Sequence, residues 1–204
     1  LGRPLLRRVR AAVGQDSPGD RALRAALSAM GCRLEERWRP GIPAFSAGRG
    51  GLRLTAQDEK GALLDPGQLL ALVTLIEMEN GGGRVAVPPG ATAAVDLVAA
   101  GYSGTVLRLD RDGAEARELY ASLPWLWSAP DAAARICARM AVSGQRLEAL
   151  MAKTPRFSAW EREVPLSQNG ERVLRILARE GRCTREGAGL RLRTPSPWRT
   201  PPPC

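Results

Sequence analysis

Few residues in this chain are of types that commonly do chemistry. Histidine is absent among the 204 residues, which removes the commonest general base and the commonest zinc ligand. The cysteines, Cys32, Cys137, Cys183 and Cys204, are far apart and form no C-x-x-C pair. This spacing does not indicate a structural zinc site. We expect reduced thiols that are mostly buried.

One group of charged side chains follows an apolar run. Asp110 and Asp112 alternate with Arg108 and Arg111 directly after a segment that reads as a strand. At the carboxyl edge of a parallel sheet, such a group can bind a ligand. A solvated turn accounts for the same residues without any ligand, so both interpretations stay open.

Two tryptophans stand two positions apart, at Trp125 and Trp127. This spacing predicts one buried ring and one exposed ring. Packing under the following helix is the simplest role, and an aromatic platform for a sugar is the alternative.

The net charge is +9, and almost all of the basic residues are arginine; only Lys60 and Lys153 are lysine. The arginines are interleaved with apolar residues at helical spacing, which favours exposed helix faces over a basic tail. A surface that binds nucleic acid or another polyanion is the alternative interpretation. We find no signal peptide and no apolar run of membrane-spanning length, so we expect a cytoplasmic protein without a membrane partner.

The first 40 residues predict one helix and one strand. A helix is expected over 21–30, with Asp20 as its cap and Gly31 as its stop. A strand is expected over 32–38. Proline and glycine residues then break the pattern, and we place a domain boundary there.

The next hundred residues predict alternating strands and helices. Asp65, Pro66 and Gln68 have the spacing of a helix start, which follows a strand over 52–56 and a turn over 57–61. That helix is expected to be mostly buried and to end at Asn80. Further elements are expected in this order: strand 84–87, helix 91–100, strand 105–109 and helices 114–122, 128–142 and 147–152. This alternation favours βαβ units with a parallel sheet.

From Pro155 the pattern changes to that of a small α+β module. Residues 157–166 have period-2 character, residues 171–179 are helical in pattern, and residues 190–193 are strand-like.

The segment from Ser46 to Leu72 resembles the active-site region of the α-D-phosphohexomutases, the phosphomannomutase and phosphoglucomutase family. In that family a D-x-D-x-D-R loop precedes a strand, a D-E-x-G turn and a helix that begins near D-x-x-x-L-L-A-L. Here the loop reads S-A-G-R-G-G-L-R, the turn D-E-K-G and the helix start D-P-G-Q-L-L-A-L. The tract T-P-R-F-S-A-W-E-R-E-V-P and the later E-G-A-G-L-R-L are similar to the start of the family's fourth domain.

The resemblance implies that the catalytic parts are missing. When Arg53 is set on the family's arginine, the three metal-binding aspartates fall on Gly48, Gly50 and Leu52. The family uses Mg²⁺, which needs oxygen donors, so we expect no metal, no cofactor and no catalytic residue here.

The family's other three loops are also missing or degenerate. Nothing corresponds to the phosphoserine loop, and residues 120–127 lack the sugar-recognition motif G-E-x-S-G. The phosphate loop corresponds to residues 193–201, which lack its glycine. Arg53, Arg193 and Ser196 remain as candidates for binding a ligand.

The resemblance implies an α/β fold with three layers, α/β/α, followed by a small partial α+β domain. It places the remnant of a preceding domain at 1–40, a domain like the family's third at 41–153 and the partial domain at 154–204. The expected function is a catalytically inactive relative that senses a hexose phosphate or serves as a scaffold. Similar regions follow a sugar-1-phosphate nucleotidyltransferase domain in bacterial fusion proteins, so we expect this chain to be part of such a longer protein. A basic module that binds nucleic acid or another polyanion is the alternative function.

Overall fold

Helices and strands alternate along the chain, and the four-stranded sheet and the β5-β6 sheet contain parallel pairs, which gives an α/β fold. The chain separates into two compact units, Leu1–Phe157 and Ser158–Cys204. The computed structural model describes residues 6–48, 50–88, 90–109, 117–118, 121–126, 128–155, 183–186 and 189–192.

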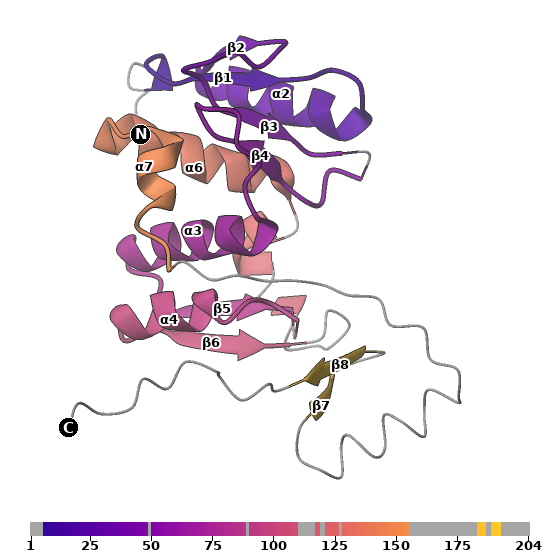
Figure 1. The fold of residues 1–204 in the computed structure, drawn as a ribbon, viewed down its shortest axis with the longest axis vertical. Helices are drawn as coiled ribbons and strands as arrows, with labels where there is room; N and C mark the ends of the chain where they lie inside the picture. Colours follow the sequence, from indigo (N-terminus) through magenta and orange to yellow (C-terminus); the bar gives the residue numbers. More distant parts are fainter. Residues whose placement is uncertain are drawn as a thin grey trace, which may run out of the picture. The chain divides into compact units, whose positions relative to one another are not determined.

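The first sheet has the strand order β2-β1-β3-β4 (Figure 1). β1 (Arg10–Val13) is an inner strand, with β2 (Arg33–Glu35) and β3 (Ala44–Ser46) parallel to it on either side. β4 (Thr55–Gln57) pairs antiparallel with β3. Three of the four residues of β1 are buried, as expected for a strand with neighbours on both sides.

The helix between β1 and β2 is α2 (Pro18–Met30), so these elements form a parallel βαβ unit. The helix ends at Gly31, as predicted, because this glycine takes the left-handed conformation at φ 98°. The predicted cap was wrong. The Ser17 side chain accepts the hydrogen bond from the Asp20 N–H at 3.0 Å, and Pro18 begins the helix.

α3 (Pro66–Glu79) begins as predicted. The Asp65 carboxylate accepts a hydrogen bond from the Gln68 N–H at 3.0 Å, and Asn80 is the residue at which the helix ends. The prediction of a mostly buried helix is also confirmed, since its buried residues are Leu69, Ala71, Leu72, Val73, Thr74, Leu75, Ile76 and Met78.

A second parallel βαβ unit follows, with β5 (Arg84–Val87), α4 (Ala94–Gly101) and β6 (Thr105–Arg108). The predicted elements at 84–87, 91–100 and 105–109 match these three closely. The parallel pairing was also predicted, because a helix between two short strands returns the chain in the same direction.

Two helices and a 3-10 turn complete the first unit. The turn η1 (Pro124–Leu126) leads into α6 (Ala129–Ser143), which is followed by α7 (Leu147–Met151). Both helices match the predictions for 128–142 and 147–152. α6 packs against α2 and against α3, and α3 in turn packs against α4 (Figure 1).

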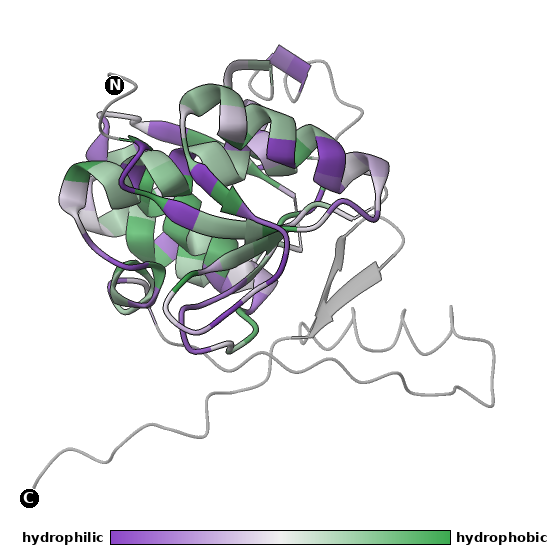
Figure 2. Ribbon diagram, turned by 90° about the horizontal axis from the view of Figure 1, so that it is seen from above, coloured by the Kyte–Doolittle hydropathy of each residue, from purple (hydrophilic) through white to green (hydrophobic). Residues whose placement is uncertain are grey.

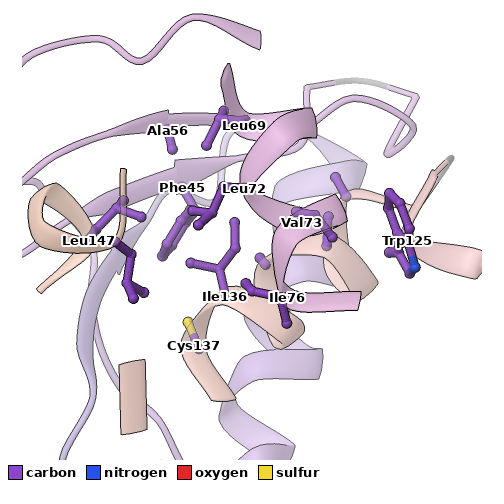
Figure 3. Packing of buried hydrophobic residues seen from close by; sticks show 14 of the residues in the cluster. Phe45, Ala56, Leu69, Leu72, Val73, Ile76, Trp125, Ile136, Cys137 and Leu147 are labelled. Carbon is purple, nitrogen blue, oxygen red and sulfur yellow. The ribbon is translucent and has the colours of Figure 1, made fainter. Parts of the chain in front are cut away.

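The core lies where these helices meet the first sheet. Figure 2 shows the hydrophobic residues mostly on the central helices and strands, with hydrophilic residues on many of the loops. Phe45 from β3, Leu72 from α3 and Ile136 from α6 are all at most 2% exposed and lie close together (Figure 3). This single cluster joins the sheet to both helices.

The boundary predicted after residue 40 does not separate two compact units. Ala12 of β1 pairs with Ala44 of β3, so the sheet continues across the proline and glycine residues near position 40. Neither β1 nor β3 was predicted. A domain remnant at 1–40 is therefore not a separate unit in the structure.

In the second unit, the described residues form an antiparallel hairpin of β7 (Cys183–Glu186) and β8 (Gly189–Leu192). β8 overlaps the strand predicted over 190–193, and β7 was not predicted. The elements predicted over 157–166 and 171–179, and most of the helix over 114–122, lie outside the described residues. No helix in the described part of the chain is both long enough and apolar enough to span a membrane.

Candidate functional site

The loop that joins β3 to β4 carries most of the site residues predicted from the sequence. It runs over 47–54, of which residue 49 is not among the described ones. Gly48 and Gly51 take positive φ angles of 59° and 65°, a conformation that glycine adopts without strain. The loop therefore turns twice before it enters β4.

Asp20 holds the start of this loop. Its Oδ1 accepts hydrogen bonds from Ser46 Oγ at 2.9 Å and from the Ala47 N–H at 2.8 Å, and its Oδ2 accepts one from Ser17 Oγ at 2.7 Å. Burial raises the pKa of the Asp20 carboxyl, but the hydrogen bonds from Ser17, Ala47 and Ser46 outweigh it and hold the pKa below its ordinary value. The sequence pointed to Asp20 only as a helix cap.

Two close approaches fix the remainder of the loop. A Cβ atom on Gly19 would lie 2.0 Å from the Gly48 carbonyl oxygen, so the first turn of α2 meets the loop backbone without space for a side chain. Further along, the Gly51 carbonyl accepts a hydrogen bond at 2.9 Å from the N–H of Ala129, the first residue of α6. The loop is thus attached to two helices.

A polar cleft of about 240 Å³ lies beside this loop. The chain leaves β1 toward β2 on one side, while β3 lies on the other side, so the cleft is at the point where the strand order reverses. Ligands of open α/β sheets bind at such points, outside the carboxyl ends of the strands. The cleft is lined by Ala12, Gly14, Asp16, Asp20, Glu36, Trp38, Ala44, Phe45, Ser46, Thr55, Ala56, Gln57 and Leu63.

Trp38 is the aromatic residue of the cleft whose position is fixed by the turn after β4. Its indole Nε1–H donates to the Asp58 carbonyl at 3.1 Å, and a Cβ on Gly61 would lie 3.0 Å from its ring. The turn itself is held by Asp58 Oδ1, which accepts from the N–H groups of Lys60 and Ala62, each at 2.9 Å. The D-E-K-G segment therefore forms the predicted turn and also supports the ring.

The cleft suits hydroxyl groups better than an anion. Asp16 and Glu36 are exposed carboxylates, and Gln57 adds a half-buried amide. Glu36 already accepts a hydrogen bond from Gln15 Nε2 at 3.0 Å. Carboxylates and amides bind hydroxyl groups well, whereas two negative charges repel a phosphate.

A neighbouring cavity of about 370 Å³ is lined by the loop itself. It shares Ser46 and Thr55 with the polar cleft, so the two are adjacent. Arg53 lines this cavity, is exposed, and forms no hydrogen bond or ion pair with any described residue. An arginine in this state can bind a phosphate or a carboxylate.

The predicted site residues of the loop lie together. Gly48, Gly50, Leu52 and Arg53 all line the same cavity. These residues do not fit Mg²⁺, because the three at the positions of the family's aspartates carry no side-chain oxygen, and the nearby Asp20 carboxylate already accepts three hydrogen bonds. Among the described residues, no three acidic or cysteine side chains gather as a metal site.

The remaining candidates divide into two groups. Arg193 and Ser196 lie outside the described residues, as do Asp110, Asp112 and Trp127. Trp125 is described and buried, and its Nε1–H donates to Glu77 Oε2 at 3.1 Å.

Comparison with known proteins does not assign this chain to a family. No protein-family model and no curated protein matches it. The resemblance to the phosphohexomutases therefore stays a prediction from the residues that carry it. What the chain does has to be argued from the cleft, the loop and their side chains.

Proposed function

We propose that this chain binds a hexose phosphate without converting it, as a non-catalytic relative of the phosphohexomutases. One observation carries the proposal. The polar cleft, which holds Trp38 and the carboxylates, adjoins the loop cavity, which holds Arg53, and Ser46 and Thr55 line both. A ligand with a polyhydroxyl part and an anionic part matches this division.

Each half of the ligand has suitable partners. Asp16, Glu36 and Gln57 offer acceptors and donors to sugar hydroxyls, and the Trp38 ring offers an apolar face to the C–H side of a sugar ring. Arg53 offers a charge-assisted hydrogen bond to the phosphate. We assign the sugar to the acidic cleft and the phosphate to the loop because the reverse would place like charges together.

The proposal excludes turnover by this chain alone. Phosphoryl transfer depends on positioning and on neutralising the charge of the transferred group. Among the described residues of the loop, Arg53 is a cation, but Gly48, Gly50 and Leu52 cannot hold a metal. Residues that bind the substrate but lack the transfer machinery suit a sensor or a scaffold within a larger sugar-activation protein.

The order of elements around the loop supports the resemblance. The loop is followed by β4, by the Asp58–Gly61 turn and by α3 with its Asp65 cap, in the order predicted from the family pattern. This agreement concerns local structure. If the chain has kept a ligand site of the family, we expect that site at this loop.

Isothermal titration of glucose 1-phosphate and mannose 1-phosphate, each with and without Mg²⁺, tests the proposal. We expect saturable binding that does not need Mg²⁺ and that prefers one epimer. Arg53→Gln should weaken binding by about tenfold, the value of one charge-assisted hydrogen bond. Arg33→Gln removes an equally exposed charge on β2, away from both cavities, and should leave the affinity unchanged.

Two results would overturn the proposal. One is that neither glucose 1-phosphate nor mannose 1-phosphate gives heat of binding. The other is binding that falls steeply with salt and does not distinguish the epimers, since counterion release is the mark of a polyanion site. That second result would favour the alternative of a module for nucleic acid or another polyanion.

A further inference from the structure

A third cavity, of about 340 Å³, shares Leu52, Arg53 and Thr55 with the loop cavity. It is bounded by the end of the β3–β4 loop, the first turns of α3, the turn η1 and the start of α6. Its volume is within the range of small-molecule sites. The lining residues are mostly apolar: Leu52, Arg53, Leu54, Thr55, Pro66, Leu69, Leu70, Val73, Trp125, Leu126 and Ala132.

The tryptophan in this wall is held in place. Trp125 lies beside Val73 at the edge of the core (Figure 3). Its Nε1–H donates to Glu77 Oε2 at 3.1 Å, and the same oxygen accepts from Arg135 Nη1 at 2.5 Å. The charge of Glu77 is therefore matched by Arg135, and the indole presents an apolar ring to the cavity.

Among the described residues, Arg53 is the only charged one in the lining of this cavity. It is exposed and has no partner among the described residues, and the neighbouring Leu52 side chain is also open to solvent, at 49% exposure. An unpaired cation beside an apolar wall is complementary to a ligand with an apolar body and one negative charge. A sugar does not suit this wall, because most of it offers no hydrogen-bond partners.

We propose that this cavity binds a small amphipathic anion, a monocarboxylate or monosulfonate with an alkyl or aromatic body. The body packs against Leu69, Val73 and Trp125, and the anionic group pairs with Arg53. This site shares only Thr55, among the described residues, with the polar cleft that holds Trp38. It does not require that a hexose phosphate binds, although two ligands that both use Arg53 would compete.

Calorimetric titration of octanoate and of 1-octanol into the full chain tests the assignment, since both probes are unbranched and have eight carbon atoms. We expect octanoate to bind at least about tenfold more tightly, and Arg53→Gln to reduce the affinity for octanoate while that for 1-octanol changes little. Displacement of 8-anilinonaphthalene-1-sulfonate by octanoate supplies a second readout on the same site.

Leu70→Trp tests the location of the site. Leu70 is half-buried and lines this cavity but neither of the other two described above. The larger ring should fill the space and abolish octanoate binding, while any binding of glucose 1-phosphate persists. Leu97→Trp is the matched control, because Leu97 lies on α4, is 63% exposed and lines none of the three cavities.

If Leu70→Trp loses the far-ultraviolet circular dichroism of the folded chain, Ala132→Leu fills the same cavity from α6 and replaces it in the test. Equal affinities for octanoate and 1-octanol would overturn the proposal, and so would octanoate binding that survives the cavity-filling variant. Failure of both glucose 1-phosphate and mannose 1-phosphate to bind would overturn the proposed function alone.

Discussion

The carboxylate of Glu59 caps the N-terminus of α7 by accepting a hydrogen bond from the backbone N–H of Leu147 at 2.7 Å. Its second oxygen accepts from the N–H of Glu148 at 3.0 Å. Glu59 is only 4% exposed and belongs to the turn after β4. One buried carboxylate thus joins the turn that supports Trp38 to the last helix of the first unit, 88 residues further along the chain.

Glu59→Gln should destabilise the first unit. The amide group retains one acceptor, but its NH₂ group faces a backbone N–H that needs an acceptor, so we expect a loss of about 2 kcal/mol in the free energy of unfolding. Urea denaturation followed by circular dichroism measures this loss. Lys60→Met is the control, because it removes only the exposed ion pair with Glu148 and should cost much less. Equal losses in both variants would contradict a capping role for Glu59.

Because of Asp20, the stability of the first unit should depend on pH in the acid range. The pKa of its carboxyl is below the ordinary value in the folded chain, so the folded state binds the proton less readily than the unfolded state does. The stabilisation is therefore fully present above the unfolded pKa and is lost as the pH falls through the folded pKa.

Asp20→Asn tests this dependence. We expect a loss of about 1–3 kcal/mol at neutral pH, since the amide replaces a carboxylate that accepts from Ser17, Ser46 and Ala47. The variant should also lose less stability than the wild type between neutral and acid pH, as measured by thermal unfolding across that range. Asp65→Asn is the control, because asparagine caps a helix as well as aspartate does. Parallel pH profiles for Asp20→Asn and the wild type would refute the assignment.

The helices could be predicted because their signals are local. Asp65, Pro66 and Gln68 mark the start of α3 within four residues, and Gly144 marks the end of α6, with φ 66°. Such signals depend on the backbone of one turn and not on the rest of the fold. The βαβ order followed from the same elements.

The strands β1 and β3 could not be predicted because they are short and their pairing is long-range. R-A-A-V and A-F-S show no alternation of polar and apolar residues. They are strands because they pair with each other and with β2 and β4. The prediction that Asp20 caps the helix was wrong for a related reason. Its carboxylate is turned toward Ala47, 27 residues away, while Ser17 takes the local capping position.

The close approach of α2 to the β3–β4 loop predicts a strong effect at Gly19. Because a Cβ there would lie 2.0 Å from the Gly48 carbonyl oxygen, Gly19→Ala must displace either the helix or the loop. We expect a loss of about 1–3 kcal/mol and weaker binding of any ligand held by Arg53. Gly101→Ala is the matched control: its Cβ would meet nothing within 4 Å at the end of α4, so stability should be unchanged or slightly raised. Thermal unfolding measures the stability of both variants. Unchanged stability of Gly19→Ala would show that the helix and the loop can move apart without cost.

Thr74 lies fully buried in α3, and its hydroxyl has no hydrogen-bond partner among the described residues. Thr74→Val replaces the hydroxyl by a methyl group of similar shape, which removes the cost of an unsatisfied polar atom. We expect the free energy of unfolding to rise by about 1 kcal/mol. Urea denaturation with an unchanged m-value would attribute the gain to the folded state. A loss of stability would mean that the hydroxyl makes a hydrogen bond in solution.

Cys32 and Cys137 are neighbouring buried thiols, and we expect them to differ in reactivity. The hydrogen bond from Cys137 lowers the pKa of the Cys32 thiol, while the hydrogen bond to Cys32 together with burial raises that of Cys137. Cys137 is also inaccessible, at 0% exposure. Because the thiolate is the reactive form, iodoacetamide should modify Cys32 of the folded chain first and Cys137 only after unfolding. Peptide mass mapping at several pH values measures both.

Two variants at position 137 separate the hydrogen bond from simple access. Cys137→Ala removes the donor, so the pH at which Cys32 is half modified in a fixed time should rise. Cys137→Ser keeps an O–H donor and should leave that pH nearer the wild-type value. If the alanine variant shows the wild-type pH dependence, the low pKa of Cys32 does not come from Cys137, and burial alone would explain the slow modification of Cys137.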